Sequence, residues 1–104
     1  MRIEKIEYVP EFVKDFGDVD ECEIYGIFEL EIVGVIFKYE LEIGFYTNPI
    51  YRNLGYMYNA LKEFIKPGYT FTVSKDNDAS NNLLKKLNIK KIKEDFFYNY
   101  YLVQ

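Results

Sequence analysis

The sequence predicts one α+β domain built on a mixed, mostly antiparallel central sheet, and three observations lead to this prediction. The run 21–48 is rich in β-branched and aromatic side chains and has no proline, so it must hold several strands. After Arg52 the apolar spacing changes from two residues to 3.6, which indicates a helix. A chain of 104 residues suffices for one domain with a core and leaves little room for a second.

The first twenty residues predict one strand followed by a short cover. Residues 2–9 place apolar side chains among charges and end at Pro10, which stops a strand. Residues 10–20 allow either one short helix or an irregular segment. Their apolar side chains at helical spacing are Phe12, Val13 and Phe16.

The run 21–48 predicts three antiparallel strands in a meander. Its breaks are placed from length alone, near 28–31 and near 38–40, because the turn chemistry inside the run is weak. Late in the run one side carries Phe37, Tyr39, Leu41, Ile43 and Phe45. The other side carries Lys38, Glu40, Glu42 and Tyr46. We therefore expect one face of this part of the sheet to be buried and the other to be polar.

The second half predicts a helix, a strand, a second helix and a final pair of strands. The apolar stripe of the first helix, which Pro67 and Gly68 stop, consists of Met57, Ala60, Leu61, Phe64 and Ile65. Residues 69–74 are β-rich, and the helical pattern that follows is closed by Asn88 in a left-handed conformation. Residues 89–95 and 96–103 give the last strands. The expected order is strand, short cover, three strands, helix, strand, helix and two strands.

Composition and charge remove several classes of function. A formal charge of −4 argues against a nucleic-acid surface, which normally carries an excess of Lys and Arg. The absence of histidine removes Ser-His-Asp triads, Cys-His pairs and the usual zinc sites, and both common Gly-rich nucleotide loops are missing. The single cysteine forms no internal disulfide, and neither a membrane span nor a signal peptide is evident. We expect a cytoplasmic protein with no metal and no nucleic-acid or membrane partner.

The turn from strand to helix at 48–57 predicts an anion site. The first turn of a helix leaves backbone N–H groups unpaired and pointing outward. Gly55 lets a ligand approach the backbone, Asn53 tolerates left-handed geometry, and Arg52 adds a permanent positive charge. On the loop alone, an ordinary turn with a solvated arginine is the simpler interpretation.

Two segments together resemble the GNAT superfamily of acyl-CoA-dependent N-acetyltransferases, in particular its ribosomal-protein-alanine acetyltransferase-like branch: EIGFYTNPIYRNLGYMYNALKEFI and TVSKDNDASNNLLKKLNIKKIKED. The similarity covers about residues 24–94, and two linked motifs are much more specific than one loop. The resemblance implies a GNAT-like domain over 1–104, acetyl-CoA as cosubstrate and a primary amine of a protein, peptide or small molecule as acceptor.

By position, the resemblance also implies the residues that bind the coenzyme. The strand end whose backbone pairs with the pantetheine arm corresponds to Phe45, Tyr46 and Thr47. The loop whose amides wrap the pyrophosphate corresponds to Arg52, Asn53, Leu54, Gly55, Tyr56 and Met57. The next motif is met by Asn77, Ser80, Leu83, Leu84 and Lys86. In this motif Asn77 takes the hydrogen bond to the pantetheine, Ser80 lies nearby, and Lys86 can reach the 3′-phosphate of the nucleotide.

Three positions depart from the family pattern. Met57 stands where Gly or Ala usually packs against the pyrophosphate, and Leu84 where many members carry a tyrosine that protonates the thiolate. Thr72 replaces a glutamate that some members use as general base, and the cover 10–20 is too short for the two helices that normally shape the acceptor pocket. These departures keep open a second hypothesis, a catalytically silent GNAT-fold binding or inhibitory module.

Acetyl transfer to an amine needs a donor to the thioester oxygen and an acceptor for the proton of the amine. We expect the donor to be the backbone N–H of Tyr46 or Thr47. Glu42 is the preferred base and Glu40 the second candidate, directly or through water, and the simpler interpretation of both is that they are solvated strand carboxylates. The short cover leaves apolar surface that a second copy can shield, so a homodimer is one option.

Overall fold

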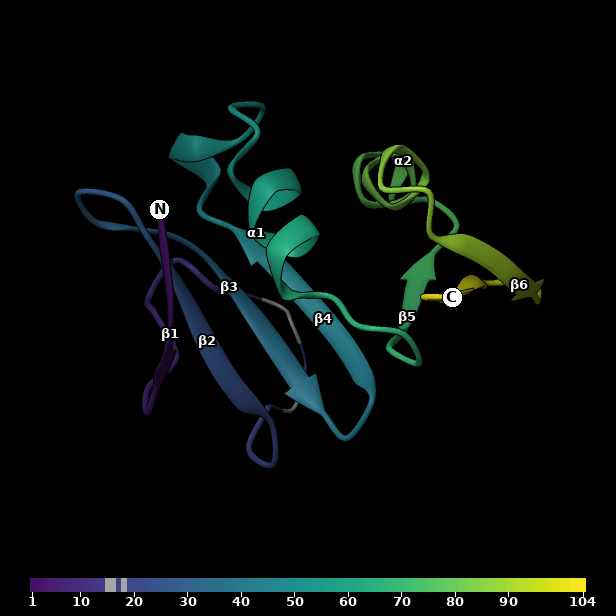
Figure 1. Ribbon diagram of the computed structural model, residues 1–104, viewed down its shortest axis with the longest axis horizontal. Helices are drawn as coiled ribbons and strands as arrows, with labels where there is room; N and C mark the ends of the chain where they lie inside the picture. The colour runs from purple at the N-terminus through teal and green to yellow at the C-terminus, as the bar shows by residue number, and fades with distance from the viewer. Residues whose placement is uncertain (15–16, 18) are drawn as a thin grey trace.

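The computed structural model describes residues 1–14, 17 and 19–104, and its elements follow the predicted order (Figure 1). One seven-stranded sheet has the strand order β1-β2-β3-β4-β5-β7-β6. Its strands are β1 (Arg2–Ile6), β2 (Glu23–Phe28), β3 (Ile32–Tyr39), β4 (Glu42–Thr47), β5 (Thr70–Ser74), β6 (Lys90–Glu94) and β7 (Tyr98–Leu102). The helices are α1 (Tyr56–Phe64), α2 (Asp78–Lys86) and the short 3-10 helix η1 (Pro49–Tyr51). The β4–β5 pair is parallel and the other five are antiparallel, so the predicted mixed, mostly antiparallel class is confirmed.

The three-strand meander is confirmed, but the continuous alternation predicted from Phe37 to Phe45 is wrong. Glu40 and Leu41 form the turn between β3 and β4, with Glu40 at φ 54°, so Glu40 is not on a strand. The turn reverses the chain, and Phe37 pairs with Gly44 rather than sharing a face with Ile43. Phe37 therefore packs on one side of the sheet, while Ile43 packs on the other.

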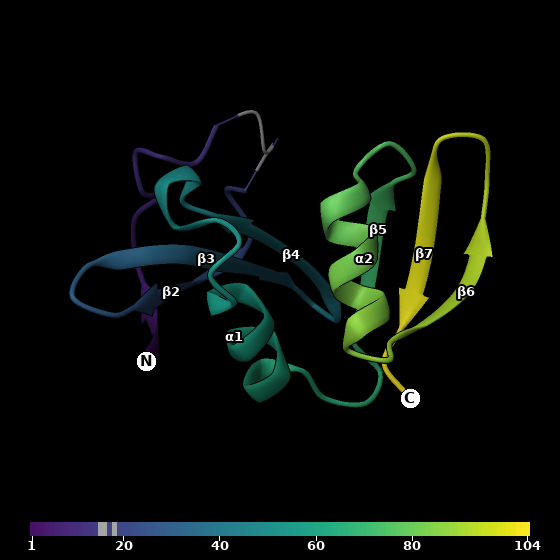
Figure 2. The ribbon, with the colours of Figure 1, turned by 90° about the horizontal axis from the view of Figure 1, so that it is seen from above.

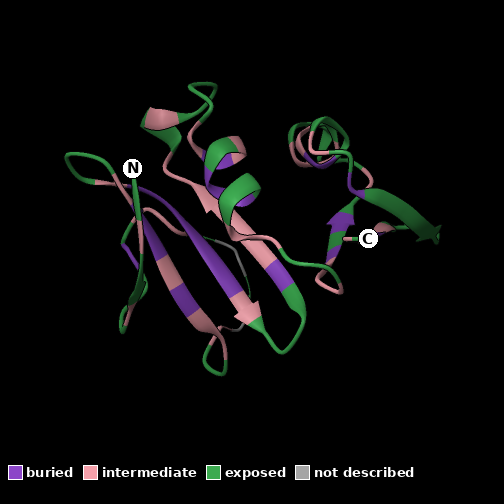
Figure 3. Ribbon diagram, in the orientation of Figure 1, coloured by how far each residue is buried: buried purple, intermediate pink, exposed green. Residues whose placement is uncertain are grey.

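The β2–β4 part of the sheet is buried on both faces, which is why the prediction of one polar face fails (Figure 3). The core under the two helices contains Ile27, Ile36, Ile43, Met57, Ala60, Leu61, Phe71 and Leu84. The core on the opposite face contains Ile24, Val35 and Phe37, with Phe12, Val13 and Cys22 packed against it. Figure 2 shows α1 and the segment after β1 on opposite sides of these strands.

The cover of the second face is irregular in its described part, 7–14, 17 and 19–22, where turns but no helix are found. Of the two forms left open by the sequence, the irregular one is therefore observed there, and the predicted contribution of Phe16 lies outside the described residues. The Phe12 ring stacks on the ring of Tyr46, with centroids 6.3 Å apart. The cover thus reaches the end of β4.

Both helices are short and amphipathic, as predicted. Met57, Ala60 and Leu61 are buried along α1, which ends just before Pro67 because proline cannot continue a helix. Asn88 has φ 60° and closes α2, so the predicted left-handed stop is confirmed. Neither helix in the described part of the chain has the length and apolar content needed to cross a membrane.

Candidate functional site

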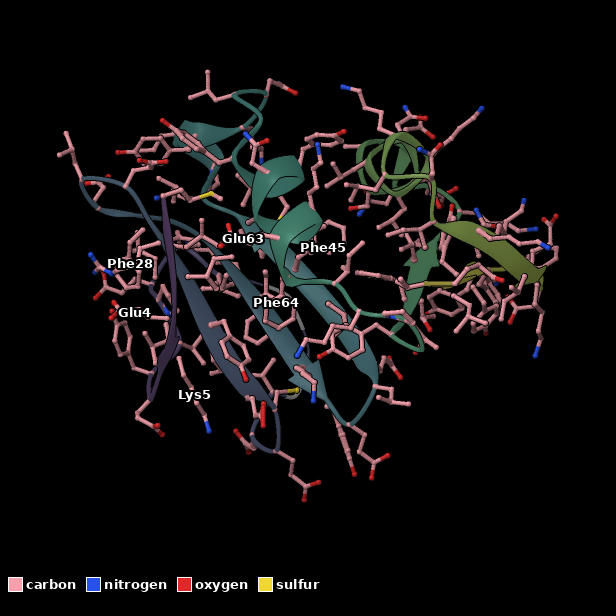
Figure 4. The ribbon with its side chains drawn as sticks, in the orientation of Figure 1. Glu4, Lys5, Phe28, Phe45, Glu63 and Phe64 are labelled. Carbon is pink, nitrogen blue, oxygen red and sulfur yellow. The ribbon has the colours of Figure 1, made fainter. Side chains whose placement is uncertain are left out.

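The candidate site begins where β4 and β5 part from each other. The parallel strands are joined at Glu42 and Thr70, where the Thr70 N–H donates to the Leu41 carbonyl at 2.8 Å. Both strands are fully described, and no further backbone pairing joins them. Beyond this point the ring of Phe45, labelled in Figure 4, packs edge to face on Phe71 with centroids 5.9 Å apart. Most of the β5-facing edge of β4 therefore has no strand partner.

The register of β3 and β4 determines which backbone groups point toward this edge. The Asn48 N–H donates to the Val33 carbonyl at 2.9 Å, and in an antiparallel pair every second residue is bonded in this way. The same alternation directs the N–H of Tyr46 toward β3 and those of Phe45 and Thr47 toward β5. Of the two donors left open by the sequence, the register thus favours Thr47 over Tyr46, and it adds Phe45.

The loop after β4 is ordered by hydrogen bonds at both of its ends. The Asn48 carbonyl accepts from the Tyr51 N–H at 2.8 Å and its side chain accepts from the Ile50 N–H at 3.3 Å, which opens η1. The Tyr51 hydroxyl donates to Glu31 at 2.5 Å, in the turn between β2 and β3. This hydrogen bond raises the pKa of Tyr51 above its usual value. The Tyr51–Glu31 hydrogen bond thus joins the loop to the turn between β2 and β3.

The chain enters α1 through two left-handed residues, Asn53 at φ 64°, which the sequence marked as tolerant of this geometry, and Gly55 at φ 82°. The first bond into the helix runs from the Asn59 N–H to the Gly55 carbonyl at 3.1 Å, and no side chain caps this end. The N–H groups of residues 56–58 consequently have no acceptor among the described residues. Three donors and the positive end of the helix dipole thus point out of the loop.

The side chains around this turn favour an anion and leave its backbone accessible. Arg52 is exposed, and its guanidinium carbon lies 5.5 Å from the centre of the Tyr46 ring. Leu54 is 61% exposed and does not cover the turn. Met57 stands where the GNAT pattern has Gly or Ala against the pyrophosphate. Its side chain is only 5% exposed and packs into the core. Its Cε lies 3.1 Å from the position of a Cβ on Gly34, so its side chain points toward β3 and away from the loop.

The start of α2 places two of the expected residues close together. Asn77 is the N-cap, and its Oδ1 accepts from the Ser80 N–H at 3.1 Å. The coenzyme contact expected of Asn77 stays a prediction, and the structure adds a role for Asn77 as the cap of α2. Leu84, which replaces the tyrosine that protonates the thiolate in many GNAT members, is fully buried in the core.

A polar network under α2 was missed by the sequence analysis. Asn81 Oδ1 accepts from the Tyr101 hydroxyl at 2.5 Å and from Asn99 Nδ2 at 3.1 Å. Its Nδ2 donates to the carbonyls of Ser74 at 3.0 Å and Asn77 at 2.9 Å. One signal was available, because Asn81 precedes buried Leu84 by three residues and so lies on the inward side of the helix. The network holds the start of α2 on β5 and β7.

The two candidate carboxylates lie at the opposite end of β4 from the turn that enters α1. Glu42 is the first residue of β4 and is exposed, three residues before Phe45, which is roughly 10 Å along a strand. Glu40 is farther away, in the β3–β4 turn. No group of three His, Cys, Asp or Glu side chains gathers into a possible metal site within the described residues.

The fold that contains this open strand pair is shared with solved N-acetyltransferases. The N-acetyltransferase PseH of Campylobacter jejuni matches 82% of this chain and 69% of its own, with a TM-score of 0.71 and 20% identity. The same enzyme in complex with acetyl coenzyme A matches the same shares, with a TM-score of 0.65 and 18% identity. A Salmonella typhimurium acetyl transferase that modifies the N-terminal serine of ribosomal protein L7/L12 matches 82% of this chain and 66% of its own, with a TM-score of 0.59 and 17% identity.

No family model matches the sequence, and no curated protein matches it significantly. Identities of 17–20% establish a common fold. A shared fold does not determine what the chain binds or does.

Proposed function

We propose that this protein is an N-acetyltransferase that transfers the acetyl group of acetyl-CoA to a primary amine. The observation that carries the proposal is a pair of backbone N–H sets without protein partners, one on the free edge of β4 and the other in the first turn of α1. In this proposal the pyrophosphate binds to the N–H groups of residues 56–58 beside Arg52. The pantetheine arm follows the edge of β4 past Thr47 and Phe45.

The reaction requires that the amine and the thioester be held close together and that a hydrogen-bond donor stabilise the oxyanion. The amine nitrogen attacks the thioester carbonyl carbon, a C–N bond forms, and the C–S bond breaks to release the coenzyme thiolate. The N–H of Phe45 or Thr47, both directed toward β5, donates to the carbonyl oxygen as it becomes negative. Leu84 offers no proton, so the thiolate is protonated by water.

The proton of the amine is passed to Glu42 through water in this proposal. A distance of roughly 10 Å from Phe45 along the strand exceeds the 2.6–3.2 Å reach of a direct transfer. Glu42 begins the strand whose edge holds the thioester, whereas Glu40 belongs to the turn before it. We therefore propose Glu42 rather than Glu40 as the base.

Two matched glycine variants test the coenzyme site. Gly55 and Gly68 both have φ above +80°, so alanine at either costs about 1–2 kcal/mol of strain. A Cβ on Gly68 meets nothing within 4 Å, and one on Gly55 meets only Asn59 Nδ2 at 4.0 Å. We expect Gly55→Ala and Gly68→Ala to lower Tm alike, while only Gly55→Ala weakens acetyl-CoA binding, by about tenfold, in isothermal titration. Wild-type protein that shows no binding at high micromolar acetyl-CoA would refute the proposal.

A second candidate is a binding or inhibitory module with this fold and no turnover. It is favoured by Leu84 and Thr72, which replace the tyrosine acid of many GNAT members and the glutamate base of some. Leu84 is fully buried, and Thr72 is exposed on β5. Mass spectrometry with a panel of peptide and small-molecule amines separates the two candidates. A product heavier by one acetyl group, with thiol release, rejects the silent module, and binding without turnover across the panel supports it.

A further inference from the structure

A row of exposed aromatic side chains runs along the β6–β7 hairpin. This aromatic row consists of Phe96, Phe97, Tyr98 and Tyr100. We propose that the aromatic row, together with the lysines of β6, is a docking surface for an extended acidic peptide segment that also carries apolar side chains. The inference goes beyond the proposed function, and it is tested without the coenzyme.

The four rings form one continuous surface. The ring centroids of Phe96 and Phe97 lie 4.9 Å apart, and those of Phe97 and Tyr98 lie 6.4 Å apart. The Tyr98 and Tyr100 rings continue the row, with centroids 6.5 Å apart. Phe96 is 85% exposed, Phe97 65% and Tyr98 44%. Scattered exposed apolar residues need no explanation, whereas a contiguous apolar patch is typical of an interaction site.

The sheet face that carries the tyrosines of the row has no cover among the described residues. Phe71 of β5 and Tyr101 of β7 belong to the core under the helices. Because side chains alternate along a strand, Thr72 and its ladder partner Tyr100 point to the opposite face, as does Tyr98. On that face the segment after β1 packs on β2–β4, and no described residue of β5, β6 or β7 belongs to this second core or packs against it.

The turn of the hairpin holds the row in place before any partner arrives. Asp95 Oδ1 accepts from the N–H groups of Phe97 at 2.9 Å and Tyr98 at 2.8 Å, and Oδ2 accepts from the Tyr100 hydroxyl at 2.7 Å. The Lys75 N–H donates to the Phe97 carbonyl at 2.9 Å, which joins the turn to the end of β5. A surface that is already ordered loses little conformational entropy when it binds a partner.

The charged groups beside the row favour an anionic partner. Strand β6 is exposed along its whole length (Figure 3). Lys93 pairs with Tyr100 in the ladder, and its ammonium lies 5.0 Å from the centre of that ring. Neither Lys93 nor Lys90 forms an ion pair within the part of the chain that the structure describes, whereas Glu94 is already bound by two lysines at 2.7 and 3.3 Å. The charge left for a partner is therefore positive.

The distribution of charge along the chain points the same way. Residues 49–104 contain nine Lys and Arg against five Asp and Glu, a net charge of +4. Residues 1–48 contain four against twelve, a net charge of −8. The hairpin belongs to the positive part, so electrostatic attraction directs an acidic partner toward it.

Shape and charge together favour a peptide over other occupants. A second copy in a two-fold contact brings the lysines of the two hairpins together, which is repulsive. The bulge between Lys91 and Lys93, with the lysines themselves, disfavours the addition of a strand at the β6 edge, so the face is the better surface. A flat membrane meets mainly the tip of a hairpin, whereas this row continues along β7 beside the exposed Thr72.

Isothermal titration with short peptides, in the absence of acetyl-CoA, tests the inference. The probe has the repeat Glu-Glu-Leu, because a polyproline II chain has about three residues per turn and aligns the leucines on one side, flanked by glutamates. One control peptide has the repeat Lys-Lys-Leu and another has Glu-Glu-Ser. We expect the probe to bind about tenfold more tightly than either control, with an affinity that falls as salt is raised.

Matched variants locate the contact. Phe97→Ser should weaken binding of the probe about tenfold, and Lys93→Gln about threefold. Leu30→Ser is the apolar control, because Leu30 is fully exposed in the turn between β2 and β3. Lys85→Gln is the charge control, because Lys85 belongs to α2 on the other face of the sheet. Both controls should bind like wild type, and circular dichroism confirms that each variant is folded.

Several outcomes overturn the inference. The first are no binding of the probe at high micromolar concentration, equal affinity for all the peptides, and losses in the two control variants as large as in Phe97→Ser and Lys93→Gln. Sedimentation that shows a wild-type dimer, dissociated by Phe97→Ser, would mean that a second copy covers the row. Flotation with phosphatidylserine vesicles that requires Phe97, without peptide binding, would assign the row to a membrane. Since no coenzyme is present, none of these results bears on the proposed function.

Discussion

Asn77 caps α2, and we propose that the same side-chain amide also binds the coenzyme. A pair of substitutions separates these two roles. Asn77 Oδ1 caps α2 by accepting from the Ser80 N–H at 3.1 Å, while its NH₂ group is the donor that a pantetheine carbonyl requires. Asn77→Asp keeps the capping oxygen and removes the donor, so we expect an unchanged Tm and weaker acetyl-CoA binding. Asn77→Ala removes both and should also cost about 0.5–2 kcal/mol of stability. Titration showing wild-type affinity in Asn77→Asp would contradict the role of this donor.

The backbone conformation of a single residue could be predicted from the sequence where few residue types tolerate that conformation. Asn88 is left-handed as expected, and Asn53, which was noted as tolerant of this geometry, is left-handed too, because few other residues tolerate positive φ. Asn81 was missed because its hydrogen-bonding partners Asn99 and Tyr101 lie 18 and 20 residues away in the chain. Local pattern carries no information about such pairs, so a polar residue inside a helix is assigned to solvent by default.

At the scale of elements, the β6–β7 hairpin depends on one carboxylate. Asp95 Oδ1 accepts from the N–H groups of Phe97 at 2.9 Å and Tyr98 at 2.8 Å, and Oδ2 accepts from the Tyr100 hydroxyl at 2.7 Å. The Tyr100 bond, followed by the two backbone bonds, lowers the pKa of Asp95 below its usual 3.8. The turn of this hairpin therefore depends on an ionised side chain.

The lowered pKa gives the sign of a pH dependence. A carboxyl whose pKa is lower in the folded state stabilises the protein above the unfolded value, and this stabilisation is lost as pH falls through the folded value. We expect Asp95→Ala to lower Tm at pH 7, and the difference from wild type to shrink as pH falls below 3.8. Asp76→Ala, at an exposed aspartate whose carboxylate accepts no hydrogen bond among the described residues, serves as control. A Tm difference for Asp95→Ala that is constant with pH would contradict the assignment.

The β3–β4 hairpin shows where element prediction stops. Its position followed from strand length, but its turn is made by Glu40 and Leu41, and Glu40 adopts φ 54° without being a typical turn residue. Alternation therefore seemed to continue through the turn and placed Phe37 on the wrong face. The pairing between strands decides on which face of the sheet a side chain lies, and the sequence alone does not reveal that pairing.

At the scale of the whole molecule, the parting of β4 from β5 divides the sheet. β1–β4 and β5–β7 are joined by the single ladder position at Glu42 and Thr70. Packing has to hold the two parts together, and one core beneath both helices includes Leu61 of α1, Leu84 of α2 and Phe71 of β5. The parting of β4 from β5 could not be predicted from residue patterns, because it is an absence of pairing between distant segments. The resemblance to GNAT motifs implied only that the backbone at the end of β4 pairs with the pantetheine arm.

Phe71 tests whether the two parts of the sheet unfold as one unit. It is 1% exposed, and its ring meets Phe45 across the parted strands at 5.9 Å. Phe71→Ala should cost about 3–5 kcal/mol, and hydrogen exchange should show amides of β3 and β7 losing protection together, since the shared core serves both parts. Phe96→Ala is the control, because Phe96 is 85% exposed and its loss should stay within about 0.5 kcal/mol.

Acetyl-CoA at a hundred times its Kd should restore about 2.7 kcal/mol to Phe71→Ala if the variant retains its affinity. Faster exchange confined to β5–β7 would instead mean that this part unfolds alone and that the packing at Phe71 does not couple it to β1–β4.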